Sequence, residues 1–308
     1  MSEEVRGIST VGLREEHAKV TSTGCAKRYA MNERKGSILI TGCSSGIGRD
    51  TAAVLQEAGW DVIASARKQE DVDRLRTEGY KAVVIDNDDD ESIAAGMRSA
   101  IEMSEGGRVW GVFCNAGYGQ PGALEDVTVR GMERQLRTNV IGTHSLLRLA
   151  VKHMGSAGGG RILINSSVLG VVGMQLRGCY VVSKFGLEGL ADVLRMEVKD
   201  LHIDVCLIEP GPVYTRFRAN GLKMFREHVE ADGSRHAKRY ESLVKKLSTK
   251  GPVAPFTMTS RRCAEMAAKA LTCARPRARY RATVQTKVFS VLKRVLPTRW
   301  LDAIAAKG

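Results

Sequence analysis

The stretch Ser37-Ile-Leu-Ile-Thr41-Gly42-Cys43-Ser44-Ser45-Gly46-Ile47-Gly48 decides the fold. An apolar run that predicts a strand leads into a glycine-rich turn, and the turn leads into a helix-compatible segment, Arg49–Gly59. Glycines at such a turn let the chain reverse sharply and let a pyrophosphate approach backbone N–H groups at a helix N-terminus. Because strand, turn and helix come in this order, the sequence predicts a dinucleotide-binding turn rather than an ordinary glycine-rich loop. The residues expected to form it are Gly42, Ser44, Ser45, Gly46, Ile47 and Gly48.

Short β-branched runs recur along the chain with helical intervals between them. The expected strands are Ser37–Thr41, Asp61–Ala66, Ala82–Asp86, Val109–Cys114, Ile162–Asn165 and Val205–Ile208. This alternation is typical of βαβ units, and strands without a strict period of two indicate a sheet covered on both faces. We therefore expect an α/β fold of the Rossmann type, a doubly wound parallel sheet in a three-layer α/β/α sandwich, as one domain over residues 36–285.

Three regions fall outside this alternation. Residues 1–35 are expected to be a flexible N-terminal extension, and Met31 is an alternative start to Met1. Residues 214–255 are rich in Lys, Arg, Glu and helix formers and are too long for an ordinary connection, so they predict a helical insertion that selects the substrate. Residues 286–308 form a basic amphipathic C-terminal segment.

Composition narrows the class of protein. The 308-residue chain has 43% hydrophobic residues and a formal net charge of +13. Residues 261–308 contain twelve Lys or Arg and two acidic residues, so +10 of that charge lies there. Seven scattered cysteines without a C-x-x-C pair support neither a disulfide framework nor a metal site, and they fit a reducing cytoplasm. We expect no bound metal, no secretory signal and no membrane-spanning segment.

A phenol and an ammonium group stand four residues apart in Tyr180-Val181-Val182-Ser183-Lys184. On a helix they share one face. A free tyrosine has a pKa near ~10, and a nearby cation lowers it by favouring the phenolate, so Lys184 is expected to make Tyr180 competent for proton transfer. Ser167 ends a predicted strand upstream, where its hydroxyl can bond a substrate carbonyl.

Together these motifs resemble the short-chain dehydrogenase/reductase family. The turn has the family spacing T-G-x-x-x-G-x-G, and the family tripeptide appears as Asn115-Ala116-Gly117, which in the family lines the adenosine side of the cofactor. The resemblance implies a catalytic tetrad of Asn139, Ser167, Tyr180 and Lys184. In it Asn139 holds a water in a proton relay, Ser167 polarises the carbonyl, Tyr180 is the general acid or base, and Lys184 also bonds the nicotinamide ribose.

The end of the second predicted strand indicates which dinucleotide binds. NAD-preferring members of the family have an acidic residue there, whereas this strand closes on Arg67 and Lys68. A 2′-phosphate needs positive charge and donors, so the sequence favours NADP(H) over NAD(H). The resemblance also places Asp86 at the adenine. It places Pro210, Gly211, Val213 and Thr215 beside the nicotinamide.

Within the family the chain looks most similar to bacterial NADP-dependent reductases of the 17β-hydroxysteroid/retinol dehydrogenase kind. That similarity implies a lipophilic alcohol or carbonyl substrate and a homodimer or homotetramer. One alternative is a catalytically idle NADP(H)-binding regulatory protein on the same fold, against which the intact Tyr180–Lys184 pair argues. A nucleic-acid binder is not expected, because the basic segment lacks aromatic interleaving and a reading motif.

The basic C-terminal segment has two interpretations that the sequence leaves open. Apolar and basic residues alternate between 287 and 307, with an interruption at Pro297. Such a pattern suits peripheral contact with the anionic inner face of a membrane or packing over the substrate pocket. It equally suits a C-terminal helix whose apolar face completes the core.

Overall fold

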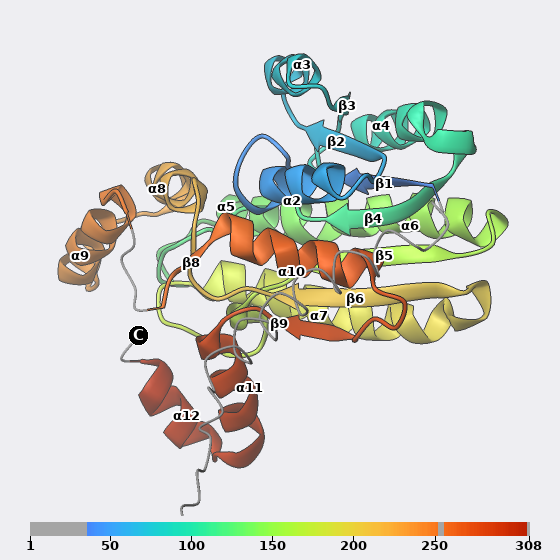
Figure 1. Ribbon diagram of the computed structural model, residues 1–308. Coiled ribbons are helices and arrows are strands. Elements are labelled where there is room, and N and C mark those ends of the chain that lie inside the picture. The colour runs from blue at the N-terminus through green and yellow to red at the C-terminus, as the bar shows by residue number, and fades with distance from the viewer. Residues whose placement is uncertain (1–35, 252–255, 307–308) are drawn as a thin grey trace, which may run out of the picture. The chain divides into compact units, whose positions relative to one another are not determined.

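Seven parallel strands form the central sheet in the order β3-β2-β1-β4-β5-β6-β9 (Figure 1). The computed structural model describes residues 36–251 and 256–306. The strands are β1 (Ser37–Ile40), β2 (Val62–Ala66), β3 (Lys81–Val84), β4 (Val109–Cys114), β5 (Gly160–Asn165), β6 (Ile203–Glu209) and β9 (Arg279–Arg281). A second, two-stranded sheet pairs β7 (Val213–Tyr214) with β8 (Met258–Thr259).

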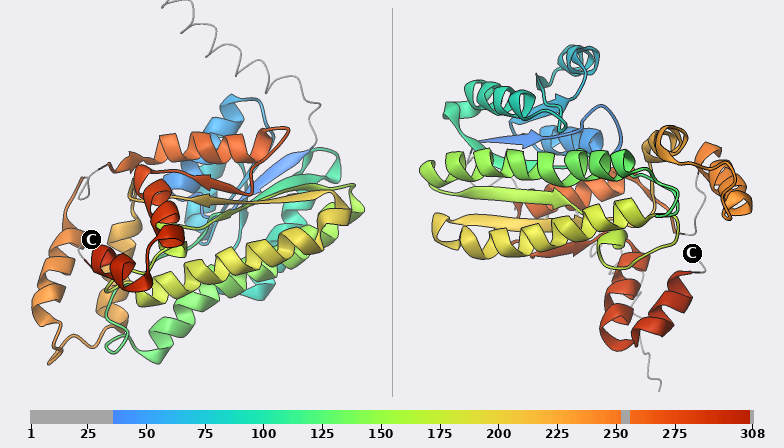
Figure 2. Two further views of the ribbon diagram at one scale, coloured as in Figure 1. Left: turned by 90° about the horizontal axis from the view of Figure 1, so that it is seen from below. Right: turned by 180° about the vertical axis from the view of Figure 1, so that it is seen from behind.

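Helices cover both faces of the large sheet (Figure 2). One face carries α2 (Gly46–Glu57), α3 (Gln69–Thr77) and α10 (Ser260–Thr272), which share an apolar cluster with the strands. The other face carries α4 (Asp90–Met103), α6 (Gly142–Ser156) and α7 (Gly178–Glu197) over a second cluster. The strands are buried on both sides, as parallel sheets require. The predicted doubly wound α/β fold is confirmed.

Further helices lie at the carboxyl ends of the strands. They are α5 (Val129–Leu136), α8 (Phe217–His228), α9 (Ala237–Ser248), α11 (Val284–Val295) and α12 (Thr298–Ala305). A π-helical turn, η2 (Arg137–Ile141), joins α5 to α6, and short 3-10 turns lie at η1 (Glu105–Gly107), η3 (Val168–Gly170) and η4 (Lys199–Leu201). In parallel α/β sheets this edge is where ligands bind.

The seventh strand, β9, was not predicted. It pairs with β6 at the sheet edge, where Ile208 lies opposite Tyr280. Two arginines make this segment look unlike a strand in the sequence, but both form ion pairs with acidic residues. Arg279 contacts Glu188 at 3.0 Å and Glu209 at 3.3 Å, and Arg281 contacts Glu209 at 3.6 Å. Burial raises the pKa of Glu209 to about 7. Ion pairing therefore lets a charged sequence form a sheet edge.

The structure describes only part of the ranges that lie outside the predicted alternation of strands and helices. Residues 1–35 and 252–255 lie outside the described part of the chain, so the expected N-terminal extension and the end of the expected insertion are not described. Helices α8 and α9 together occupy most of the range 214–255.

Two predicted strands end earlier than expected. The third strand ends at Val84, so Asp86 follows β3 and does not close it as predicted. The first strand ends at Ile40, one residue before the predicted end at Thr41.

Candidate active site

The glycine-rich turn between β1 and α2 presents a helix N-terminus to the carboxyl edge of the sheet. Gly42 and Gly46 have φ values of +72° and +66°, a left-handed conformation that favours glycine. Ser45 is the N-cap residue of α2. A Cβ on Gly48 would clash with the Asn115 side chain and lie 2.7 Å from the Gly42 carbonyl oxygen. The turn is therefore packed tightly against Asn115 on one side and lines the large cavity at the N-terminus of α2, which fits a pyrophosphate.

Asn115-Ala116-Gly117 ties the end of β4 to the end of β1. The Asn115 amide donates to the Thr41 carbonyl oxygen at 2.8 Å, and the Thr41 hydroxyl accepts from the N–H groups of Asn115 and Ala116 at 3.0 Å each. The Asn165 side chain at the end of β5 donates to Asn115 Oδ1 at 3.0 Å. The tripeptide thus holds three neighbouring strand ends in register below the turn.

The two basic residues after β2 have different surroundings. Arg67 is exposed and lines the large cavity. Lys68 is not part of the cavity wall, and its ammonium group pairs with Glu70 at 2.8 Å. Arg74, which the sequence did not suggest, donates to the Ser44 carbonyl oxygen at 3.0 Å and so braces the turn. Of the predicted pair, Arg67 alone lines the cavity.

Ser167, Tyr180 and Lys184 meet at the start of α7. Tyr180 is 9% exposed, and the neighbouring Ser167 side chain acts to lower the pKa of its phenol. Lys184 follows one helical turn later; its ammonium lies 5.5 Å from the centroid of the Tyr180 ring and donates to the Asn165 carbonyl oxygen at 2.6 Å. The structure therefore brings together a hydroxyl, a phenol and an ammonium that sequence spacing had grouped.

Asn139 lies behind this group in the π-helical turn η2. Its amide donates to the Tyr118 carbonyl oxygen at 2.9 Å and to the Ser183 hydroxyl at 3.1 Å, while its Oδ1 accepts from the Tyr118 N–H at 3.1 Å. The side chain therefore links η2 to α7 and does not reach the cavity wall. A water relay through Asn139 stays a prediction.

Burial changes the expected acidity of the pair. It raises the pKa of Tyr180 to about 12, although the Ser167 hydrogen bond and the charge of Arg177 act in the opposite direction. Burial also lowers the pKa of Lys184 to about 8. The expectation that Lys184 lowers the phenol pKa is not met in this arrangement, because desolvation outweighs a cation whose ammonium is turned toward Asn165. At neutral pH Tyr180 is protonated.

The depressed lysine pKa predicts a stability effect in the cofactor-free protein. Below about pH 8 the folded state holds Lys184 charged against its burial, so Lys184→Met should raise the free energy of unfolding near pH 7 by up to about 3 kcal/mol. Between about pH 8 and 10 the unfolded wild type binds more protons, so the wild type gains stability and the difference should shrink. Urea unfolding near pH 7 and near pH 10 measures this.

The exposed Lys152 on α6 provides the control for this prediction. Lys152→Met should show no difference that depends on pH. A Lys184→Met protein that is less stable than wild type near pH 7 would contradict the predicted desolvation cost and show that the bond to Asn165 dominates.

One cavity of about 890 Å³ connects the turn to Tyr180 and continues to α8 and α9. Among the described residues, nearly all predicted cofactor and catalytic positions line it. These are Gly42, Ser44, Ser45, Gly46, Ile47, Arg67, Asp86, Asn115, Ala116, Gly117, Ser167, Tyr180, Lys184, Pro210, Gly211, Val213 and Thr215. Gly48, Lys68 and Asn139 are absent from the wall. Sequence reasoning missed Arg177, Phe217 and the cavity-facing residues of α9.

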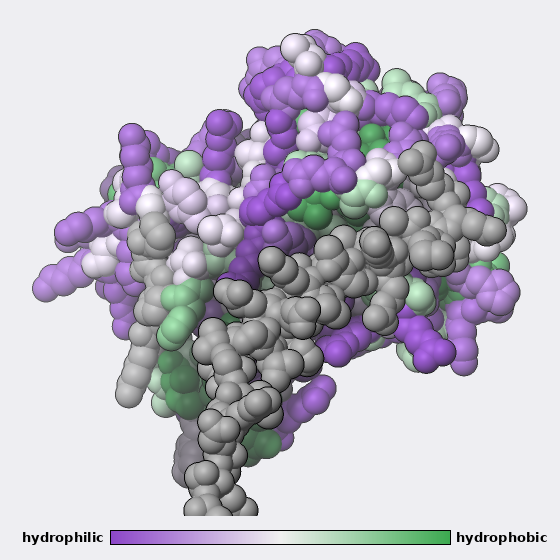
Figure 3. All heavy atoms as spheres, viewed as in Figure 1, coloured by the Kyte–Doolittle hydropathy of each residue, from purple (hydrophilic) through white to green (hydrophobic). Residues whose placement is uncertain are grey.

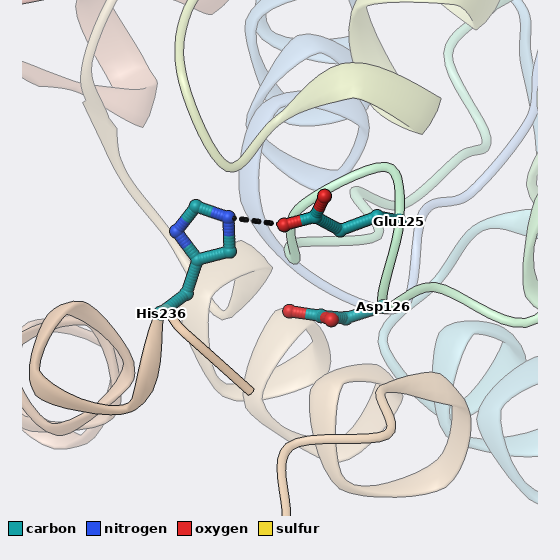
Figure 4. A group of neighbouring side chains, drawn as sticks. All are labelled: Glu125, Asp126 and His236. Atoms are coloured by element: carbon teal, nitrogen blue, oxygen red, sulfur yellow. Dashed lines mark hydrogen bonds and ion pairs between the residues drawn. The ribbon is translucent and has the colours of Figure 1, made fainter. Parts of the chain in front are cut away.

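The loop before α5 anchors the α8–α9 segment. Glu125 contacts Arg235 at 2.6 Å and His236 at 2.7 Å, and Asp126 accepts from Ser234 at 2.6 Å and from the Tyr240 hydroxyl. Figure 4 shows Glu125, Asp126 and His236 with the contact between Glu125 and His236. Glu125, Asp126 and His236 lie close enough together to hold a metal ion. Both carboxylates already have protein donors, so we interpret the group as the attachment of the segment that covers the cavity.

The C-terminal helices pack over the same site. Phe289 of α11 and Leu301 and Ala305 of α12 belong to an apolar cluster that includes Tyr180, and Ala306 reaches the cavity wall. Other apolar residues of these helices stay exposed, among them Val291, Val295 and Trp300. One face of these helices therefore packs over the pocket, as one interpretation of the segment expected, and the other face is exposed.

A parallel sheet with a dinucleotide turn and a buried Ser–Tyr–Lys group define a Rossmann-fold oxidoreductase. The family model described as short chain dehydrogenase matches residues 37–224. The chain belongs to the short-chain dehydrogenase/reductase family, and the predicted family is confirmed. Within the described residues no helix has the length and apolarity needed to cross a membrane.

Two relatives and one solved structure illustrate the likeness. The uncharacterized oxidoreductase YbbO of Escherichia coli (strain K12) is 37% identical over 268 residues, which are 87% of this chain and 93% of that protein. 17-beta-hydroxysteroid dehydrogenase type 1 of Homo sapiens is 35% identical over 193 residues, 58% of this chain and 57% of that one. A Burkholderia phymatum short chain dehydrogenase/reductase solved with NAD shares the fold, with a TM-score of 0.70 at 21% identity, covering 86% of this chain and 94% of that chain.

Proposed function

We propose that the protein is an NADP(H)-dependent oxidoreductase that interconverts an alcohol and a carbonyl group on a lipophilic small molecule. The observation that carries the proposal is the position of Ser167 and Tyr180 in one cavity with the dinucleotide turn. When bound, NADPH supplies the hydride. Ser167 and Tyr180 converge on the substrate oxygen, and Tyr180 gives it a proton as the carbonyl carbon receives the hydride.

The protonation state of Tyr180 is compatible with proton donation in the reductive direction. A phenol with a pKa raised to about 12 is fully protonated at neutral pH and is ready to act as an acid. Lys184 holds its position through Asn165 and keeps a positive charge below about pH 8, next to the phenolate that forms. The chain's own groups therefore supply orientation, a proton and a nearby cation.

The preference for NADP(H) over NAD(H) rests on Arg67. It lines the cavity at the end of β2, and the sequence has no carboxylate at that strand end to bond a ribose 2′-hydroxyl. A guanidinium presents paired donors that match a phosphate.

The purified protein, incubated with NADPH or NADH and a panel of aliphatic, aromatic and steroidal carbonyls, tests the proposal. Oxidation of NADPH with at least one class of carbonyl, and slower oxidation of NADH, is expected. Binding of NADPH without oxidation by any carbonyl would favour the idle regulatory alternative.

The surroundings of the enzyme are a further part of the proposal. We propose a cytoplasmic homodimer or homotetramer, supported by exposed apolar residues on α7 such as Val182, Phe185 and Met196. We also propose peripheral contact with an anionic membrane through the open face of α11 and α12, where apolar residues alternate with Lys and Arg. Light scattering tests the first, and sedimentation with anionic against zwitterionic vesicles tests the second.

A further inference from the structure

The wall of the large cavity carries an uneven distribution of charge. Its acidic residues are Asp86 and Asp88, which follow β3 on the adenosine side of the turn. Its basic residues beyond Tyr180 come from the start of α7 and from the α8–α9 segment. They are Arg177, Arg216, Arg218, Lys223, Lys238, Arg239 and Lys246. The part of the cavity beyond the catalytic group is therefore cationic.

Arg177 is the member of this set that stands closest in the sequence to Tyr180. It is the N-cap residue of α7, three residues before Tyr180, and both residues line the cavity. It lines the cavity, burial lowers its pKa, and its charge acts on the Tyr180 phenol. The guanidinium therefore shares the cavity with the phenol and influences it electrostatically.

No carboxylate of the described residues lies within ion-pair distance of Arg177. Its one side-chain hydrogen bond, to the Leu176 carbonyl oxygen, is 3.4 Å long. Other shielded arginines of the chain are matched: Arg161 pairs with Asp204 at 3.0 Å, and Arg279 with Asp192 at 2.7 Å. A desolvated cation without an acidic partner is costly, and an anionic ligand removes that cost.

The cationic groups surround an apolar wall. Met174, Leu176, Phe217, Met224 and Leu243 line the cavity on the same side as Arg177. The Phe217 ring packs edge-on against Tyr180 with centroids 5.4 Å apart. An elongated apolar body therefore fits beside the reacting group.

The outer cations lie at the entrance of the cavity. Lys223 on α8 and Lys238 and Lys246 on α9 are exposed, and the described part of the chain places no carboxylate within 4 Å of their ammonium groups. Hydrophilic side chains project from these two helices (Figure 3). Charge of one sign around a cleft raises the rate at which an oppositely charged ligand enters it.

We propose that the substrate is an oxo acid: a carbonyl compound with an apolar body and a carboxylate that Arg177 binds next to the reacting carbonyl. The lysines of α8 and α9 attract it. This inference rests on the proposed carbonyl reductase function and names the class of substrate. A planar guanidinium in an apolar wall matches a carboxylate through paired hydrogen bonds.

A matched pair of substrates tests the proposal. 4-Oxodecanoate and its methyl ester share the carbonyl and the apolar body and differ in charge. With NADPH, kcat/KM for the acid should exceed that for the ester by about tenfold or more, the effect of one charged hydrogen-bonded contact. Arg177→Met should remove this ratio and Arg177→Lys should retain part of it. The ratio is the informative quantity, because a change in Tyr180 acidity slows both substrates alike.

Two controls complete the experiment. Arg226 is an exposed arginine of α8 outside the cavity wall, so Arg226→Met should leave the ratio unchanged. Lys246→Met should weaken the salt dependence of kcat/KM for the acid, whereas Lys245→Met, at the neighbouring position outside the wall, should not. Equal kcat/KM for acid and ester in the wild type overturns this inference alone. No NADPH oxidation with any carbonyl overturns the proposed function and the inference with it.

Discussion

Tyr180→Phe is expected to lower kcat for carbonyl reduction by about 10²- to 10⁴-fold, the usual contribution of a positioned general acid. The phenyl ring keeps the packing against Phe217 and removes the phenolic proton donor beside Ser167. Nucleotide affinity should change little, because the turn, Asn115 and Arg67 are untouched. Steady-state kinetics with NADPH, together with nucleotide titration, separates the two effects.

Tyr118 provides a matched control for that substitution. It is a second phenol of the same cavity wall, and burial raises its pKa to about 12 as well. Its hydroxyl does not meet Ser167, so Tyr118→Phe should leave kcat within a factor of about three, a difference below 1 kcal/mol. Equal losses in the two variants would mean that Tyr180 acts through packing.

Arg67→Asp is expected to reverse the preference for NADPH over NADH. Loss of a charge-assisted contact to the 2′-phosphate costs about 1.5–3 kcal/mol, about 10- to 100-fold in kcat/KM for NADPH, and the new carboxylate repels the phosphate further. The same carboxylate is an acceptor for the ribose 2′-hydroxyl of NADH.

The neighbouring Lys68 tests whether position or charge alone decides this preference. Lys68→Asp makes the same change of charge one residue away, at a side chain that pairs with Glu70 outside the cavity wall. Its ratio of NADPH to NADH activity should stay near that of the wild type. An unchanged ratio in Arg67→Asp would refute the role assigned to Arg67.

The dinucleotide turn and the Tyr180–Lys184 pair were predictable because each is local in sequence. Gly42, Gly46 and Gly48 stand at fixed spacing between a strand and a helix, and Lys184 follows Tyr180 by one helical turn. Local spacing fixes such geometry before tertiary contacts are known. The doubly wound parallel sheet was predictable because strands that alternate with helical crossovers leave few topologies.

The features that were missed depend on contacts between distant segments. Strand β9 was hidden because Arg279 is neutralised by Glu188 and Asp192 on α7 and by Glu209 on β6. The acidity of Tyr180 was misjudged because burial comes from the whole fold, including the C-terminal helices. Arg177 belongs to no sequence motif. Its candidate role as an anion-binding residue depends on the absence of an acidic partner among the described residues, which the sequence does not reveal.

Transfer of deuterium from NADPH that is deuterated at the reactive face of nicotinamide C4 tests directly whether this site transfers a hydride to a carbonyl carbon. Wild-type protein should give an alcohol product with one deuterium on the former carbonyl carbon, detected by mass spectrometry, and Tyr180→Phe should give the same labelled product far more slowly. Nucleotide binding with no labelled alcohol from any carbonyl, tested with both C4-deuterated epimers, would contradict hydride transfer by this site.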